Sequence, residues 1–257
     1  MSRRLGYSGL ALGSTGMNSD VSAALLSELK AVPTLAQLSA ASLQWLGSQV
    51  KLRDIAAGQA LLMQDAWGNV VYLILSGWAK VRRSVGIRTA EGTQDSAQTL
   101  ALLGPGAWVG EMAVLDEAPR SRDVLALTPL RAAGIPAATF KALMLQEPHL
   151  CYRLACSLSR RLRLANLQAD LDRQSPPLRV VHALVQLAEA FGEKTEQGVR
   201  IVYPPLQDLA DISQVSREVA AAVLGRLQQQ GVIQVLPEHQ SLLLVQYAKL
   251  VEATRLL

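Results

Sequence analysis

The residues best suited to chemistry lie in one short stretch that begins at Gly110 and follows a glycine-rich turn. Within it stand an acidic residue, Glu111, and the pair Arg120 and Ser121. Backbone N–H groups in a tight turn can surround an anion, and a guanidinium gives phosphate oxygens a forked, permanently charged partner. A carboxylate can accept a hydrogen bond from a ribose hydroxyl. The pattern therefore fits a phosphodiester-binding site and fits a surface turn with a solvated arginine equally well.

The stretch resembles the phosphate-binding cassette of cyclic-nucleotide-binding domains, which runs Gly-Glu-Leu/Met-Ala, a short variable segment, then Arg-Ser/Ala-Ala. Six residues match this pattern: Gly110, Glu111, Met112, Ala113, Arg120 and Ser121. Arg122 stands where the family usually has a small residue, and we count this additional cation among the candidate ligand contacts. The resemblance implies a cyclic nucleotide as effector, with cyclic AMP first and cyclic GMP or cyclic di-GMP as alternatives.

The composition limits the classes of protein that fit. A chain of 257 residues holds one large or two ordinary domains, and with 50% apolar but only 4% aromatic residues its core must be aliphatic. The net charge of +4 suits a polyanionic partner without demanding one. The two cysteines are too few for a four-cysteine metal site, and the three histidines are scattered. We therefore expect no metal site, no cofactor and no catalytic residues.

The sequence contains no membrane-spanning pattern. No stretch approaches the roughly 18 consecutive apolar residues of a membrane helix. Glycine and serine interrupt any signal-peptide core near the N-terminus. We expect a cytoplasmic protein without a membrane partner.

The first half of the chain reads as a short flexible segment followed by a strand-rich domain. Residues 1–34 lack a sustained period and are expected to be flexible, although 20–30 could form a helix. Short apolar or β-branched runs follow, separated by Gly, Asp and Asn, and the polar residues 88–96 are expected to form a loop. Roughly eight short strands with near-regular turns suggest a β-barrel or jelly roll over residues 35–147.

Residues 137–173 are expected to be helical. Four leucines, Leu150, Leu154, Leu158 and Leu162, are four residues apart, and the apolar stripe continues to Leu171. A narrow stripe on a long helix suits a coiled-coil seam between two chains. Packing against the protein's own barrel is the alternative. The prolines at 176 and 177 break the helix, so the dimerisation helix is placed at 148–174.

The C-terminal part has a helix-turn-helix pattern. Residues 206–212 read as a short helix, 213–215 as a turn, and 216–227 as a second helix capped by Ser216. Two strands follow at 232–236 and 242–245. This order is that of a winged helix-turn-helix that binds DNA.

This part resembles the DNA-binding domain of the Crp/Fnr regulators. Ser216, Arg217 and Glu218 match the start of that family's recognition helix, where Arg reads guanine and Glu accepts from the cytosine amino group. Gln214 stands where the family usually has glycine, and Ala222 where it usually has a second arginine. We place Gln214 with the other three among the candidate DNA contacts.

Together the two resemblances, which cover roughly residues 40–245, imply an α+β protein: an N-terminal cyclic-nucleotide-binding jelly roll, a long dimerisation helix and a winged helix-turn-helix at 175–257. They imply a homodimeric transcription regulator, not an enzyme, that binds double-stranded DNA and contacts RNA polymerase. A Crp/Fnr-type regulator that responds to cyclic di-GMP, or to no ligand, is the alternative. A gated enzyme would need a catalytic domain for which no residues are left.

Ser157, Ser159 and Asn166 on the long helix are candidates for contacting the base, with the helix register open.

Overall fold

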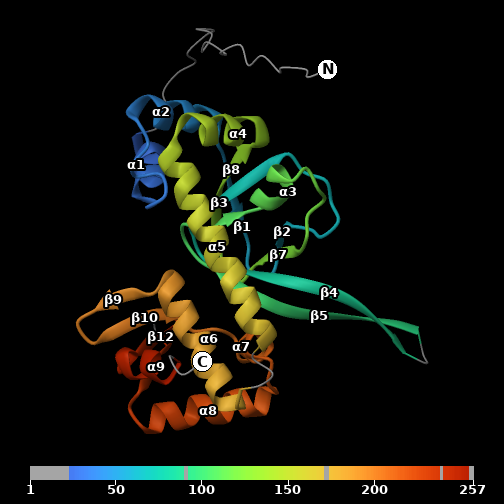
Figure 1. Ribbon diagram of the computed structural model, residues 1–257, viewed down its shortest axis with the longest axis vertical. Coiled ribbons are helices and arrows are strands. Elements are labelled where there is room, and N and C mark those ends of the chain that lie inside the picture. Colours follow the sequence, from blue (N-terminus) through green and yellow to red (C-terminus); the bar gives the residue numbers. More distant parts are fainter. Residues whose placement is uncertain (1–22, 90–91, 171–173, 238–239, 255–257) are drawn as a thin grey trace, which may run out of the picture.

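The structure is a computed structural model that describes residues 23–89, 92–170, 174–237 and 240–254. A strand-rich part lies at one end of the molecule and a mainly helical part at the other, and the long helix α5 (Pro148–Asp170) runs between them (Figure 1). Within the described ranges, no helix has both the length and the apolar character needed to cross a bilayer.

The strand-rich part consists of two four-stranded antiparallel sheets, as expected for a jelly roll. The first sheet has the order β1 (Lys51–Ile55), β8 (Leu130–Pro136), β3 (Val70–Ser76) and β6 (Trp108–Val109). The second has the order β2 (Ala60–Leu62), β7 (Asp123–Ala126), β4 (Ala79–Thr89) and β5 (Gly92–Leu103). Aliphatic side chains from both sheets, among them Ile74, Ala132 and Val124, meet in one buried cluster between them.

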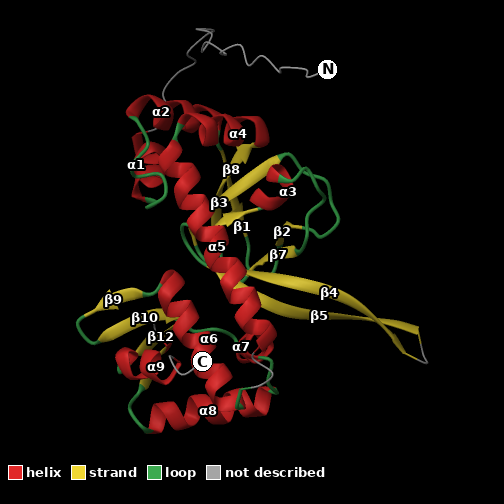
Figure 2. Ribbon diagram, in the orientation of Figure 1, coloured by secondary structure: helices red, strands yellow, loops and turns green. Residues whose placement is uncertain are grey.

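The expected loop at 88–96 is wrong. Strands β4 and β5 pair from Ala79 opposite Leu103 to Thr89 opposite Gly92, with one register shift between Val81 and Arg82, and form a hairpin that projects from the barrel (Figure 2). The polar composition of this segment hid the hairpin because backbone hydrogen bonds between strands do not depend on side-chain polarity.

Four helices cover the outer face of the first sheet: α1 (Ala23–Ala31), α2 (Ala40–Gln49), α4 (Ala137–Gln146) and the first half of α5. The expectation of a flexible segment up to residue 34 is therefore wrong for its last part. Leu29 is fully buried and Val32 nearly so, because the apolar side of α1 packs in the same cluster as Leu46 and Phe140. Residues 1–22, which include the start of the possible helix at 20–30, lie outside the described residues.

The stretch expected to be helical, 137–173, contains two helices in its described part, since α4 ends at Gln146 and α5 begins at Pro148. A proline at the first turn of a helix is favourable, whereas inside a helix it would remove a hydrogen bond. The end of the predicted leucine stripe, Leu171, lies outside the described residues.

The C-terminal part has the predicted winged helix-turn-helix. Helix α6 (Pro176–Phe191) and strands β9 (Glu193–Thr195) and β10 (Gly198–Val202) precede α7 (Leu206–Ser213) and α8 (Arg217–Gln229). Strands β11 (Ile233–Leu236) and β12 (Ser241–Leu244) follow, and then α9 (Tyr247–Thr254). The sheet order is β11-β12-β10-β9. Its core also takes in Leu102 of β5 and contacts Trp78, so the apolar packing continues from the barrel into this part.

Candidate functional site

The cassette residues form a turn between β6 and α3 (Glu111–Leu115). Gly110 has a left-handed backbone with φ of 78°, which favours glycine. A Cβ atom on Gly110 would lie 2.5 Å from Nη1 of Arg120, and one on Gly68 would lie 2.7 Å from its Nη2. Two glycines therefore make room for the guanidinium.

The Arg120 side chain joins this turn to strand β3. Nη1 donates to the carbonyl of Gly110 and Nη2 to the carbonyl of Val70, both at 2.6 Å. Strand β6 is only two residues long, so the Val70 carbonyl lies beyond the end of its pairing with β3. Arg120 is only 4% exposed, and this burial lowers the pKa of its guanidinium while leaving it charged at neutral pH. Its first role is to fix the shape of the cassette.

Glu111 is buried and paired with the long helix. Nη1 of Arg161 donates to Oε1 of Glu111 at 2.7 Å, and Nη2 donates to the carbonyl of Trp108 at 2.7 Å. Glu111 is 2% exposed, so removing Arg161 would leave a buried carboxylate without its ion pair. This ion pair links α5 to the cassette, although its two residues are 50 positions apart in the sequence.

The structure brings together Gly110, Glu111 and Arg120 and spreads the other predicted residues around them. Ala113 is buried in α3, while Met112 and Ser121 are exposed. Arg122 turns back along the chain, and its Nη1 donates to the carbonyl of Ser121.

Sequence reasoning missed Arg161, although the helical period could have found it. A helix turns ~100° per residue, so Arg161 lies ~20° around α5 from Leu150, whereas Leu162 lies ~120° away. Leu150 and Leu154 are buried against the barrel, and Leu162 is 63% exposed. The leucine stripe is therefore not one seam: its first half packs on the protein's own barrel.

The opposite side of α5 is exposed and has its own regular spacing. Tyr152, Ala155, Ser159, Leu162 and Asn166 are separated alternately by three and four residues, the period of a coiled-coil seam. Of the three candidates for contacting the base, Ser157 is half-buried, while Ser159 and Asn166 are exposed on this side.

The helix-turn-helix presents its predicted contacts at one end of α8. Ser216 caps the helix, with its Oγ accepting from the N–H of Val219 at 3.3 Å. Ser216, Arg217 and Glu218 are exposed. The backbone N–H of Glu218 itself, followed by the Ser216 hydroxyl, lowers the pKa of Glu218. Glu218 is thus an ionised acceptor at neutral pH, as contact with a cytosine amino group requires.

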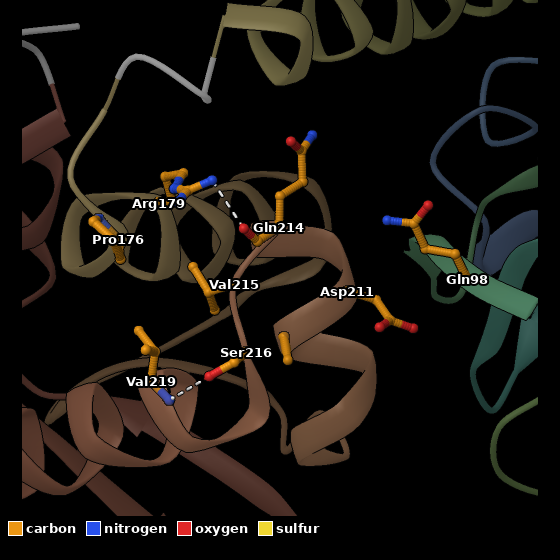
Figure 3. Close-up of a pocket in the computed structure, with 9 residues that line it drawn as sticks. Gln98, Pro176, Arg179, Asp211, Gln214, Val215, Ser216 and Val219 are labelled. Atoms are coloured by element: carbon orange, nitrogen blue, oxygen red, sulfur yellow. Dashed lines mark hydrogen bonds between the residues drawn. The ribbon is translucent and has the colours of Figure 1, made fainter.

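Gln214 lies in the turn rather than on the helix. Its φ of 53° is left-handed, which explains why glycine suits this position. Nη1 of Arg179 on α6 donates to its carbonyl at 2.8 Å and supports the turn. Figure 3 shows these residues around a hollow of about 400 Å³, with Gln98 of β5 on the far side of Asp211.

The C-terminal part is not basic overall. From residue 176 onward the sequence has seven Lys and Arg residues against eight Asp and Glu residues. Attraction to DNA therefore depends on individual basic side chains such as Arg217 rather than on the charge of the whole domain.

Comparison with known proteins identifies the family. Residues 52–147 match the family model for a cyclic nucleotide-binding domain, and residues 178–253 match that for a Crp-like helix-turn-helix domain. The cyclic AMP receptor protein of Thermus thermophilus is 35% identical over 182 residues, which cover 70% of this chain and 78% of that protein. The chain belongs to the cyclic AMP receptor protein (CRP/FNR) family.

Other members of the CRP family are similar over most of the chain. A CRP-like cAMP-activated global transcriptional regulator of Mycobacterium tuberculosis is 27% identical over 212 residues, 82% of this chain and 91% of that protein. The solved structure of the c-di-GMP responsive regulator CLP from Xanthomonas campestris has a TM-score of 0.58 at 21% identity, covering 80% of this chain and 99% of that one. This last likeness concerns the fold. The family consists of transcription regulators, and this chain is one, with a cyclic nucleotide-binding domain and a DNA-binding helix-turn-helix.

Proposed function

We propose that this regulator binds a cyclic nucleotide, cyclic AMP in the first instance, in its cassette, and that the nucleotide controls sequence-specific binding to double-stranded DNA. The observation that carries the proposal is the link between Glu111 in the cassette and Arg161 on α5. A ligand that changes this pair acts directly on the helix that joins the two sites. The ligand shifts the equilibrium between two conformations only to the extent that it binds one of them more tightly than the other.

The cassette offers a distinct group for each part of a cyclic nucleotide. Arg161 contacts Oε1 of Glu111, and the second carboxylate oxygen can accept a ribose hydroxyl. The phosphate is held by the backbone N–H groups of Gly110, Met112 and Ala113 and by the Ser121 hydroxyl. A guanidinium has five N–H donors, so Arg120 can serve the phosphate while it holds its two carbonyls. Arg122 adds a second cation at the rim.

The effector has one serious alternative to cyclic AMP. The relatives from Thermus thermophilus and Mycobacterium tuberculosis are named for cAMP, and the regulator CLP is described as c-di-GMP responsive. The additional cation at Arg122 favours a ligand with more than one phosphate, and so keeps cyclic di-GMP as the second candidate.

We propose that two copies of the chain pair through the exposed side of α5. Leu162 and Tyr152 supply apolar area, Ala155 and Ser159 allow close approach, and Asn166 sets the register. The two recognition helices would then read half-sites about one helical turn, ~34 Å, apart. Within each chain, we place the nucleotide domain before residue 148, with α1 packed on it, the dimerisation helix in α5 and the DNA-binding domain from residue 175 onward, with RNA polymerase as a further partner.

The test combines calorimetry with DNA selection on the purified full chain. Cyclic AMP, cyclic GMP and cyclic di-GMP are titrated separately, and the DNA sequence is selected from a random pool with and without the ligand that binds. We expect one nucleotide to bind and to change the affinity for the selected DNA. Ser121→Ala should weaken nucleotide binding, while Ser48→Ala, a change on the exposed side of α2, serves as its control. Binding of no nucleotide, or binding without any effect on DNA affinity, would refute the proposal.

A further inference from the structure

The first helix of the DNA-binding domain is bonded directly to the barrel. Nζ of Lys80, on β4, contacts the two carboxylate oxygens of Asp208, on α7, at 3.0 and 3.2 Å. The hydroxyl of Thr99, on β5, donates to Oδ1 of the same carboxylate at 2.6 Å. Asp208 is 3% exposed and Thr99 2% exposed. The Lys80 side chain is 24% exposed, so this junction between the barrel and α7 combines two buried polar groups with one that is partly exposed.

A second carboxylate on the same side of α7 gives this helix a second point of contact with the barrel. The backbone N–H of Thr99 donates to Oδ2 of Asp211 at 2.9 Å, and Nε2 of Gln207 holds the other oxygen at 2.8 Å. Asp208 and Asp211 are three residues apart and so face the same way on a helix. We name Lys80, Thr99, Asp208 and Asp211 the docking cluster.

Apolar contacts alone would hold the domain less specifically. Trp78 and Phe191 meet edge to face with ring centroids 5.3 Å apart, close to the docking cluster's side of the barrel. Apolar contact has no direction and tolerates sliding. The buried ion pair has a direction, because displacing Lys80 would leave the Asp208 carboxylate buried without its charge partner. The docking cluster therefore selects one orientation of α7.

The docking cluster is also close in the fold to the cassette. Lys80 lies opposite Leu125 in the pairing of β4 with β7, and Arg82 lies opposite Asp123. Asp123 follows Arg120 by three residues, and its Oδ2 accepts from the hydroxyl of Ser84, on β4, at 2.8 Å. Strands β7 and β4 thus connect the cassette loop to the docking cluster, so a shift of the loop can be passed on to Lys80 through their pairing.

We infer that the docking cluster positions the recognition helix and carries the effect of the nucleotide to it, through β7 and β4, in addition to the route along α5. Helices α7 and α8 are packed together through the turn, so fixing α7 fixes α8. Lys80, Thr99, Asp208 and Asp211 are positioning residues, since they act through α8 rather than by touching DNA. The inference rests on the proposed function, because the signal it carries is the nucleotide's.

The test compares Lys80→Met with Arg131→Met, which removes from β8 the ion pairs with Glu28 at 3.0 Å and Asp54 at 3.2 Å. For each full-length protein, the affinity for the selected DNA is measured with and without the bound nucleotide. The ratio of these two DNA affinities, with and without nucleotide, should lie in the usual allosteric range of about 5- to 150-fold in the wild type. We expect Lys80→Met to lower the ratio by at least about threefold, to the part that α5 carries, with nucleotide affinity retained. Arg131→Met should keep the wild-type ratio.

A charge exchange separates positioning from simple loss of packing. The double variant Lys80→Asp/Asp208→Lys restores an ion pair in the reverse sense and should recover at least part of the ratio. A wild-type ratio in Lys80→Met would overturn the inference and would show that α5 carries the signal alone. No recovery in the double variant, with a cooperative fold intact, would also overturn it.

A second measurement does not depend on the nucleotide. Spin labels at Leu145→Cys and Gln229→Cys, with Cys151 and Cys156 changed to alanine, report the distance between the barrel and the end of α8. Labelled chain is diluted with unlabelled chain so that distances within one chain dominate. We expect one narrow distribution, and a broad one in Lys80→Met; a distribution that stays narrow overturns the inference. If the wild type shows no nucleotide dependence, the proposed function fails, and this measurement still decides whether the docking cluster positions α8.

Discussion

Replacing Arg120 by alanine should cost stability before it costs ligand binding. The guanidinium donates to two carbonyls, of Gly110 and Val70, at 2.6 Å each, and the residue is 4% exposed. A buried acceptor left without its partner costs about 1–3 kcal/mol, so the change should lower the free energy of unfolding by about 2–6 kcal/mol. That is a large share of the ~5–15 kcal/mol that stabilises a typical domain.

The assay is urea unfolding followed by circular dichroism, at equal protein concentration because the chain is proposed to dimerise. Arg122→Ala is the matched control: among the residues that the structure describes, Arg122 donates only to the carbonyl of its neighbour Ser121, so the change should alter stability by less than about 0.5 kcal/mol. Arg120→Lys should fall between the two, because one ammonium cannot bridge two carbonyls as a guanidinium does. If Arg120→Ala proved as stable as Arg122→Ala, the structural role of Arg120 would be refuted, and a ligand contact alone would explain its presence in the motif.

Three further predictions concern the other parts of the molecule. Leu162→Glu should shift the chain toward monomer in sedimentation velocity, because a charge would enter the proposed seam, while Leu145→Glu on the exposed side of α4 should not. Arg217→Ala should weaken binding to the selected DNA by about 1–3 kcal/mol and relax one base position, whereas an equal loss on random DNA would indicate a phosphate contact instead. Burial lowers the pKa of His182 below its ordinary 6.5, so the unfolded chain binds this proton more readily and stability is lost as pH falls below about 6.5. His182→Leu should flatten the unfolding free energy between pH 6.5 and 5, and an unchanged pH slope would contradict this assignment.

Much of the fold could be predicted from local patterns. The winged helix-turn-helix follows from apolar spacing, the cap at Ser216 and the two short strands after α8, and all of these depend on neighbours in sequence. Most jelly-roll strands were marked by apolar runs between turns. The outer part of the β4–β5 hairpin, at 88–96, was not, because its polar sequence contains no apolar run or alternation to detect.

The long helix shows what a local sequence pattern cannot predict. Steps of four residues drift by ~40° each around a helix, so Leu162 left the barrel side while Arg161 stayed on it. The angular positions of these residues around the helix follow from the sequence, but the sequence does not show which side of α5 the barrel covers. Burial of Leu150 and Leu154 against helices and strands from elsewhere in the chain decided that.

The sequence by itself determined the motifs: a glycine-rich cassette with Glu111 and Arg120, and a capped recognition helix that begins at Ser216. Their residue types and spacing are local, and local chemistry can be read along a chain. Only the tertiary structure decided what each charged group is paired with, such as Glu111 with Arg161 and Lys80 with Asp208. Those partners are 50 and 128 residues apart, and they meet because whole helices and sheets dock on their apolar faces, which the charged residues do not control.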